Sequence, residues 1–315
     1  MRTVTALFVG LGSIGTRHLK NLANLCADRG WTLQADALRS DLSRPLRDGV
    51  AALLHAQYTD LTAAPAQYDM VFITNPTSLH AEALAQVKGR GGALFIEKPI
   101  FSAEQTGLAL ADYLPAGQKA YVAAPMRWCG VMLALKELLP ALHPYCARVI
   151  CSSYLPDWRP GVDYRTVYSA HKALGGGVTI DLIHEWDYLV ELFGVPEKLC
   201  NFKGTYSDLE IDSDDLSVYI AQYPSLLAEV HLDYFGRGYR RSIELFCHDG
   251  SYIADFGKGT LTLPDGTVQD YRESTDAWYK REMTYFLDYA QNGSGKSVNS
   301  PAEALDVLRL TLGQL

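Results

Sequence analysis

The sequence predicts an α/β protein. An N-terminal Rossmann domain with a doubly wound parallel sheet precedes an α+β domain with an open mixed, mostly antiparallel sheet. Three observations predict this. Apolar strand patterns alternate with helical patterns over residues 1–122, as in right-handed βαβ units. A glycine motif at 10–15 joins the first strand to the first helix. Beyond residue 123, longer strands follow one another with hairpin signals between them.

The first domain, residues 1–122, is predicted from its alternation of short apolar runs and amphipathic segments. Its strands are expected at 4–9, 33–38, 69–74, 93–96 and 119–123. Its helices are expected after residue 15 and at 50–58, 78–87 and 103–114. Thr77 or Ser78 is the expected cap of the helix over 78–87, because both side chains can accept a backbone hydrogen bond there.

The second domain, residues 123–315, is predicted to build one sheet that helices cover on one face. Helices are expected at 132–139, 276–289 and 302–312, and the last of them is a candidate to return to the Rossmann domain. Strands are expected at 148–155, 197–206, 215–222, 228–235, 240–248 and 250–255. The Asp-Gly pairs at 249–250 and 265–266 are typical of tight hairpin turns.

Composition narrows the class of partner. The chain has 315 residues and a formal net charge of −8, and it contains no basic run. These features argue against nucleic acid and against an anionic membrane, and they favour a small-molecule partner. The six cysteines form no CxxC pair, so the sequence predicts neither a zinc site nor a thioredoxin-type redox motif, and the cysteines are expected to be reduced thiols. With no signal-peptide pattern and no membrane-spanning window, we expect a cytoplasmic protein.

The motif Gly-Leu-Gly-Ser-Ile-Gly at 10–15 predicts a dinucleotide site. Gly10 allows the tight turn, Gly12 lets the backbone approach a pyrophosphate, and Gly15 lets the helix lie close to the sheet. The helix then begins around Ser13 and Ile14, where unpaired N–H groups and the helix dipole favour an anion. The alternative is a glycine-rich turn without a ligand.

The end of the second strand selects between the two nicotinamide cofactors. An acidic residue there binds the ribose of NAD, whereas an arginine accommodates the 2′-phosphate of NADP. Here Arg39 takes that position, and Ser40 adds a hydroxyl donor. The sequence therefore predicts a preference for NADP over NAD. The alternative is that Arg39 points into solvent and Asp41 binds the ribose of NAD.

Three further segments carry a family resemblance. Thr74-Asn75-Pro76-Thr-Ser-Leu-His80 and Glu97-Lys98-Pro99 each follow a predicted strand, and Gly175-Gly-Gly-Val-Thr-Ile-Asp181-Leu-Ile-His184-Glu-Trp-Asp187 lies in the second domain. Together with the glycine motif, they make the chain resemble the glucose–fructose oxidoreductase / inositol dehydrogenase (Gfo/Idh/MocA) family. The resemblance covers nearly the whole chain.

The resemblance implies the site residues. Lys98 would lie near the nicotinamide and hold the reacting oxygen, His184 would be the general base, and Asp181 would orient the substrate or the catalytic groups. A cis bond between Lys98 and Pro99 is common in the family. Asp181 lies three residues before His184, whereas the family spacing is four; both spacings put the two side chains on one face of a helix. The cofactor site would also include Thr74, Asn75, Pro76, His80 and Glu97.

The segment 154–165 is aromatic and polar, and it precedes the catalytic motif. Such side chains stack on sugar rings and bind hydroxyls or anions, so a sugar, sugar acid or nucleotide sugar is the predicted substrate. The candidate substrate-binding residues are Tyr154, Trp158, Arg159 and Tyr164, together with Arg127, which matches a family arginine. A structural connection packed by its own aromatic residues is the alternative.

The sequence also allows two other functions, a reductase of a non-sugar substrate and a non-catalytic sensor. The same fold reduces non-sugar substrates, and a dinucleotide-binding sensor would need no turnover. Lys98 before a proline could be a solvated surface charge, and His184 could be an ordinary polar residue of its helix. The presence of both favours an enzyme. The resemblance also implies a homo-oligomer, either a dimer or a tetramer.

Overall fold

The computed structural model describes residues 2–315, which form two compact units. The first unit contains the residues up to 124 together with 279–305, and the second contains 125–278 together with 306–315. Across the described residues, none of the helices is both long and apolar enough to cross a membrane.

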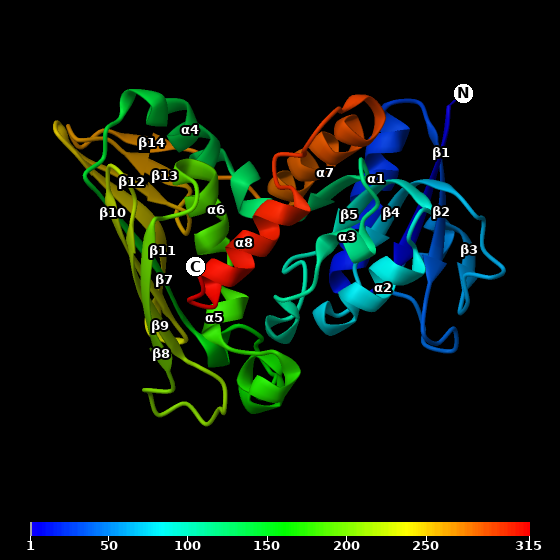
Figure 1. The fold of residues 1–315 in the computed structure, drawn as a ribbon, viewed down its shortest axis with the longest axis horizontal. Helices are drawn as coiled ribbons and strands as arrows, with labels where there is room; N and C mark the ends of the chain where they lie inside the picture. The colour runs from blue at the N-terminus through cyan, green and yellow to red at the C-terminus, as the bar shows by residue number, and fades with distance from the viewer. Residues whose placement is uncertain (1) are drawn as a thin grey trace. The chain divides into compact units, whose positions relative to one another are not determined.

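The first unit is built on a parallel six-stranded sheet (Figure 1). Its order is β3-β2-β1-β4-β5-β6, the doubly wound order of dinucleotide-binding folds. The strands are β1 (Thr3–Val9), β2 (Thr32–Leu38), β3 (Leu54–Tyr58), β4 (Tyr68–Ile73), β5 (Gly91–Ile96) and β6 (Lys119–Val122). The strand order reverses between β1 and β4, so the carboxyl ends of these two strands form the edge where such sheets bind ligands.

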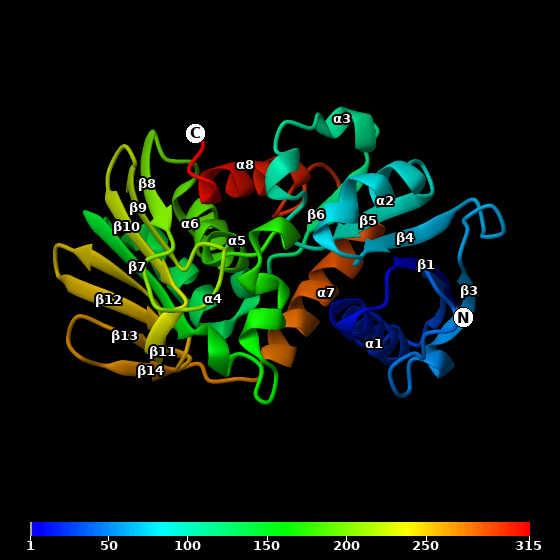
Figure 2. The same cartoon turned by 90° about the horizontal axis from the view of Figure 1, so that it is seen from below.

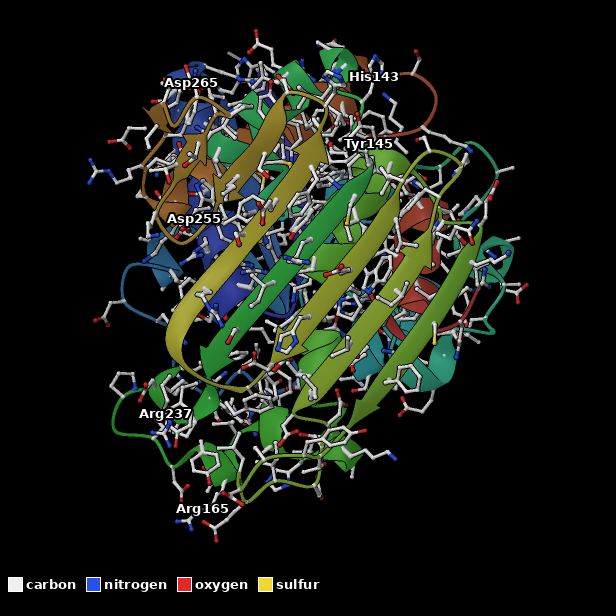
Figure 3. The ribbon with its side chains drawn as sticks, turned by 90° about the vertical axis from the view of Figure 1, so that its left-hand side faces the viewer. His143, Tyr145, Arg165, Arg237, Asp255 and Asp265 are labelled. Carbon is white, nitrogen blue, oxygen red and sulfur yellow. The ribbon has the colours of Figure 1, made fainter. Side chains whose placement is uncertain are left out.

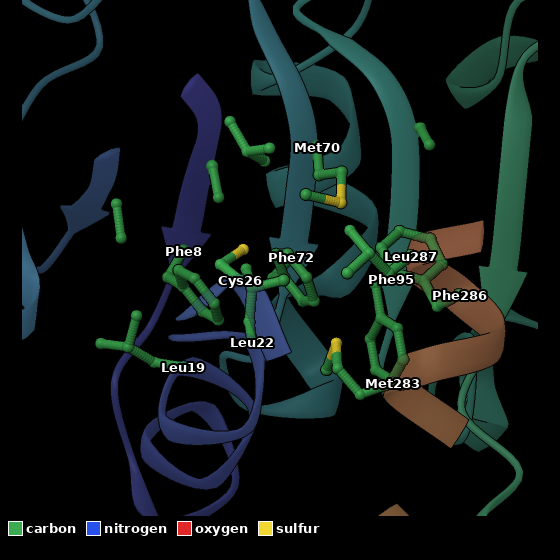
Figure 4. Close-up of a cluster of buried hydrophobic side chains, with 14 of the residues drawn as sticks. Phe8, Leu19, Leu22, Cys26, Met70, Phe72, Phe95, Met283, Phe286 and Leu287 are labelled. Carbon is green, nitrogen blue, oxygen red and sulfur yellow. The ribbon is translucent and has the colours of Figure 1, made fainter. Parts of the chain in front are cut away.

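Helices cover both faces of this sheet (Figure 2). Helices α1 (Ser13–Asp28) and α7 (Thr275–Asn292) cover one face, and α2 (His80–Gln86) and α3 (Leu110–Tyr113) lie on the other. The core beneath α1 and α7 is aromatic, with Phe8 stacked on Phe72 at 4.4 Å between ring centroids (Figure 4). Phe286 from α7 meets Phe72 and Phe95 edge to face, which ties this late helix to the first sheet.

Three predictions about this unit were wrong. Residues 50–58 form a short 3-10 turn and then the edge strand β3, whose alternating exposure fits a strand beside β2. Residues 103–114 form only a 3-10 turn at Ala103–Gln105 and the four-residue α3, with Gly107 between them. Helix α2 starts at His80 after a 3-10 turn, and neither Thr77 nor Ser78 caps it.

The second unit is built on an eight-stranded sheet of order β14-β13-β12-β11-β7-β10-β9-β8. Strands β7 and β10 run parallel, and the other neighbours run antiparallel. This confirms the predicted mixed sheet. The strands are β7 (Cys146–Tyr154), β8 (Lys198–Gly204), β9 (Leu216–Gln222), β10 (Leu227–Asp233), β11 (Phe235–Cys247), β12 (Gly250–Asp255), β13 (Thr260–Thr262) and β14 (Val268–Asp270).

Helices cover one face of this second sheet. They are α4 (Gly130–Leu138), α5 (Val178–Asp181) and α6 (His184–Phe193), with α8 (Pro301–Thr311) divided between the two units (Figure 1). The opposite face carries side chains but, within the described chain, no helix (Figure 3). It exposes large apolar side chains, including Phe202, Ile220 and Leu227.

Candidate active site

The glycine motif brings the first turn against the end of β4. Gly10 has a φ of +90°, and a Cβ placed on it would lie 2.8 Å from the Asn75 Cα. A Cβ on Gly15 would lie 2.6 Å from both the Gly10 carbonyl oxygen and the Thr74 Oγ1. The Thr74 hydroxyl donates to the Gly10 carbonyl at 2.6 Å. Both glycines are therefore required by backbone packing, and Thr74 locks the turn.

The start of α1 has the features of an anion site. Helix α1 begins at Ser13, and within residues 2–315 no side chain caps it. A Cβ on Gly12 would meet no described atom within 4 Å, so space lies open there. Nearby, the buried Oδ1 of Asn75 has no hydrogen-bond partner in the described chain. A dinucleotide fits this arrangement, because the first-turn N–H groups, including that of Ile14, can bind its pyrophosphate.

A cavity of about 300 Å³ extends from this turn along the end of β2. Arg39, Ser40, Asn75 and Pro76 help to line it. The Arg39 guanidinium donates to the Gln57 Oε1 at 2.8 Å and to the Arg44 carbonyl, so its position is set by its own unit.

Asp41, the alternative ribose ligand, is held in its own turn. Its carboxylate accepts the Ser43 hydroxyl at 2.7 Å and the Ser43 N–H at 2.8 Å. These hydrogen bonds hold the pKa of the Asp41 carboxyl below its usual value. Asp41 is thus engaged locally, whereas Arg39 faces the cavity.

The Lys98 loop follows β5, and its Lys98–Pro99 bond is cis, as the family resemblance implied. Glu97 is buried and His80 is fully buried. One ring nitrogen of His80 lies 3.1 Å from the Pro99 carbonyl oxygen, and the other lies 3.1 Å from the Asn75 carbonyl oxygen. Burial lowers the pKa of His80, which favours a neutral ring. His80 therefore joins the loop after β4 to the loop after β5.

Gly176 and Gly177 have a steric role in the second unit. A Cβ on Gly176 would lie 2.0 Å from the Tyr168 carbonyl oxygen. Gly177 has a φ of +131°, and its Cβ would lie 2.3 Å from the Asp214 Oδ1. Because side chains cannot fit at these positions, the glycines let the segment carrying Tyr168 lie against the start of α5.

Asp181 and His184 lie in separate helices. Helix α5 ends at Asp181 and α6 begins at His184, so the prediction of one continuous helical face was wrong. Two tyrosines hold the Asp181 carboxylate. The Tyr168 hydroxyl donates to one oxygen at 2.5 Å, and the Tyr234 hydroxyl donates to the other at 2.6 Å. Neither tyrosine belongs to a recognisable motif, and sequence reasoning missed both.

Two buried ion pairs anchor the first turn of α6. Arg241 binds Glu185 through two hydrogen bonds of 2.6 and 3.0 Å. Arg127 binds the Asp187 carboxylate through two hydrogen bonds of 3.0 and 2.9 Å. Arg127 was predicted to contact the substrate, but here it is only 2% exposed and its guanidinium holds α6. Both pairs lie within three residues after His184 along the helix.

The structure brings only some of the predicted substrate-binding residues close to one another. Trp158 is 38% exposed, meets Tyr234 edge to face at 5.2 Å, and donates its indole N–H to the Ser153 hydroxyl. Arg159 is exposed on the same segment. The Tyr154 ring instead lies 3.8 Å from the Arg237 guanidinium.

Tyr164 lies apart from this aromatic group. Its hydroxyl accepts the Glu210 N–H at 3.2 Å. Of the predicted substrate residues, the structure thus connects Trp158 to Asp181 through Tyr234 and gives Tyr164 a different neighbour.

Comparisons with known proteins identify similar chains. Residues 4–121 match a family model described as "Oxidoreductase family, NAD-binding Rossmann fold". The chain is 24% identical over 301 residues to the uncharacterized oxidoreductase YrbE of Bacillus subtilis (strain 168), covering 89% of this chain and 84% of that protein.

Solved structures share the fold over the full length. One is levoglucosan dehydrogenase in complex with NADH and levoglucosan, with a TM-score of 0.82, 16% identity, and 99% and 96% of the two chains covered. Another is the UDP-N-acetylglucosamine 3-dehydrogenase GnnA of Acidithiobacillus ferrooxidans, with a TM-score of 0.72, 20% identity, and 100% and 97% covered.

Proposed function

Because the chain belongs to the Gfo/Idh/MocA family of nicotinamide-dependent oxidoreductases, we propose that it oxidises a hydroxyl carbon, or reduces a keto carbon, of a sugar-like substrate. One observation carries the proposal. Within the first unit, the glycine turn, the loop after β4 and the Lys98 loop all lie at the carboxyl ends of β1, β4 and β5, where doubly wound sheets bind their ligands. We further propose that residues 1–122 bind the cofactor and residues 123–315 the substrate.

The catalytic roles follow from the chemistry of the side chains. When bound, the nicotinamide supplies the hydride chemistry. The Lys98 ammonium stabilises developing negative charge on the reacting oxygen, and His184 accepts the hydroxyl proton as general base. Two phenols hold the Asp181 carboxylate in place, which suits an orienting role.

The substrate class rests on the second unit. Trp158 presents an exposed ring beside the Tyr234–Asp181 pair, and aromatic faces of this kind stack on sugar rings. Arg159 is an exposed cation on the same segment and suits an acidic group of the substrate. The levoglucosan and UDP-N-acetylglucosamine dehydrogenases that share the fold support a sugar or a nucleotide sugar.

For the cofactor, we propose a preference for NADP. Arg39 lines the cavity at the end of β2, while Asp41 is engaged with Ser43. A guanidinium can bind the 2′-phosphate through two parallel hydrogen bonds. The test compares the Michaelis constants for NADH and NADPH in the native protein and in Arg39→Asp. A native preference for NADH would refute this assignment.

We also propose that two copies pair through the bare face of the second sheet, and that the enzyme acts in the cytoplasm. Phe202, Ile220 and Leu227 expose apolar surface on that sheet, which pairing would bury. Sedimentation of the native protein and of Ile220→Glu tests the pairing. The charged variant should sediment as a smaller species.

The central experiment incubates the protein with NADP or NAD and a panel of sugars, sugar acids and nucleotide sugars, and follows the absorbance of the reduced nicotinamide. Lys98→Ala and His184→Ala should each abolish turnover while binding of NADPH, measured by fluorescence, stays close to native. Near-native rates in both variants would defeat the catalytic assignment. A protein that binds NADPH but oxidises none of the panel would be a sensor or an enzyme for another substrate class.

A further inference from the structure

A buried hydrogen-bonded pair, His18 and Glu97, lies next to the Lys98 loop. The His18 Nε2, from the second turn of α1, lies 2.5 Å from the Glu97 Oε1, and His18 is fully buried. The other carboxylate oxygen of Glu97 accepts the backbone N–H of Lys98 at 3.2 Å. One carboxylate thus joins the helix that begins at the glycine turn to the residue proposed to stabilise the reacting oxygen.

The surroundings of His18 determine that its ring is the donor in the hydrogen bond with Glu97. Its ring lies between Phe95 and Tyr279, at 4.6 and 5.8 Å between centroids. Its Nδ1 is buried and has no hydrogen-bond partner among residues 2–315. A proton on Nδ1 would be a buried donor without an acceptor, so the favoured tautomer carries its proton on Nε2 and donates to Glu97.

The charge on Glu97 follows from its neighbours. Burial acts to raise the pKa of Glu97, but the hydrogen bond from His18 and the charge of the neighbouring Lys98 lower it below its usual value. Tyr279, Arg17 and Glu282 are the other titratable groups in contact with this region of the first unit. Glu97 is therefore an anion at neutral pH, adjacent in the chain to the Lys98 cation.

We propose that His18 and Glu97 are positioning residues for Lys98: His18 fixes the Glu97 carboxylate, and Glu97 holds the Lys98 backbone and keeps the Lys98 amine in its charged form. The function proposed above does not include either role. The catalytic consequence rests on the proposed role of Lys98, whereas the effect on its amine does not. Because α1 begins at the glycine turn, the pair also ties the phosphate site to the Lys98 loop.

The test measures the state of the Lys98 amine directly. The full-length protein is labelled with acetic anhydride between pH 6 and 10, and acetylation of Lys98 is quantified by mass spectrometry against the exposed Lys198. Glu97→Gln removes the charge, and His18→Leu removes the donor. Both should move the half-maximal labelling of Lys98 to lower pH and raise its relative labelling at pH 7 by about tenfold, the ratio for one pH unit.

Two matched variants separate charge from loop geometry. His18→Gln keeps an N–H donor near the position of Nε2 and should label like the native protein. His80→Asn loosens the same loop through its carbonyl contacts without removing a carboxylate, so it should not move the labelling midpoint. Circular dichroism confirms that each variant folds.

The outcomes are distinct. An unmoved midpoint in Glu97→Gln, or a shift in His80→Asn or His18→Gln as large as in His18→Leu, would overturn the proposal. A shifted midpoint with undiminished turnover would leave the charge effect standing and would overturn the catalytic role of Lys98 instead. Because labelling requires no substrate, a failure of the whole panel would not affect this test.

Discussion

The candidate functional groups of the two units are held in place by different means. In the first unit, the groups offered to a ligand are mostly backbone N–H groups, and glycines at 10, 12 and 15 make room for the turn that presents them. In the second unit, the candidate groups are side chains, and buried partners hold them in place. The first arrangement depends on the absence of side chains, whereas the second depends on their complete pairing. The two should therefore fail in different ways when residues are changed.

The largest effect is expected at the Arg241–Glu185 pair. Glu185 is fully buried and the Arg241 side chain is 15% exposed, so Arg241→Met leaves a buried carboxylate without its partner. Such a loss costs about 3–5 kcal/mol in the free energy of unfolding. Urea denaturation measures it. The double variant Glu185→Met, Arg241→Met should recover most of the loss, and a double variant as unstable as the single one would contradict this account.

In the glycine turn, unlike at the Arg241–Glu185 pair, a substitution should weaken cofactor binding while leaving the stability of the fold nearly unchanged. Gly12→Ala adds a methyl group where the structure has open space, so the thermal unfolding midpoint should stay near native. The methyl group would occupy the approach to the pyrophosphate, and the affinity for NADPH should fall by about 10- to 100-fold. Gly10→Ala is the matched control. Its Cβ would lie 2.8 Å from the Asn75 Cα, so both stability and binding should fall. Equal stabilities for the two variants would break the comparison.

The difference between the two units also explains which parts of the candidate site could be predicted from the sequence. Gly10 and Lys98 each belong to a contiguous motif that can be recognised in the chain, so their part of the site could be predicted although Gly10 packs against the distant Asn75. The contact between Tyr234 and Asp181 joins residues 53 apart, and the ion pair of Arg241 joins residues 56 apart. Periodicity and spacing carry no signal for such contacts. The same limit explains 50–58, where only pairing with β2 makes the segment a strand.

The two tyrosines on Asp181 provide a matched pair within the second unit. Tyr234 is fully buried, and Tyr234→Phe leaves a carboxylate oxygen without its donor, which costs about 1–3 kcal/mol in the free energy of unfolding. Tyr168 is 44% exposed and its hydrogen bond to Asp181 is only partly buried, so Tyr168→Phe should cost less than Tyr234→Phe, about 1 kcal/mol or less. If Asp181 orients the substrate, both variants should lower kcat/KM. Equal stability losses would show that burial does not separate the two hydroxyls.

The smallest effect is expected at a second Arg–Glu pair, Arg148 and Glu229, which lies on the sheet that also carries Arg241. Arg148 and Glu229 lie opposite each other on β7 and β10, with Nε and Oε2 2.8 Å apart and side chains 55% and 40% exposed. The geometry matches that of Arg241 and Glu185, but water solvates this pair. Arg148→Ala should therefore change the free energy of unfolding far less than Arg241→Met does, and added salt should reduce the effect further. The free energy of unfolding should be measured at low protein concentration, where the copies of the chain are dissociated. If the effect grows with protein concentration, Arg148 lies in a face that a second copy of the chain covers, as the proposed pairing of the bare sheet requires. If the loss in dilute solution is as large as that of Arg241→Met, burial is not what separates the two pairs.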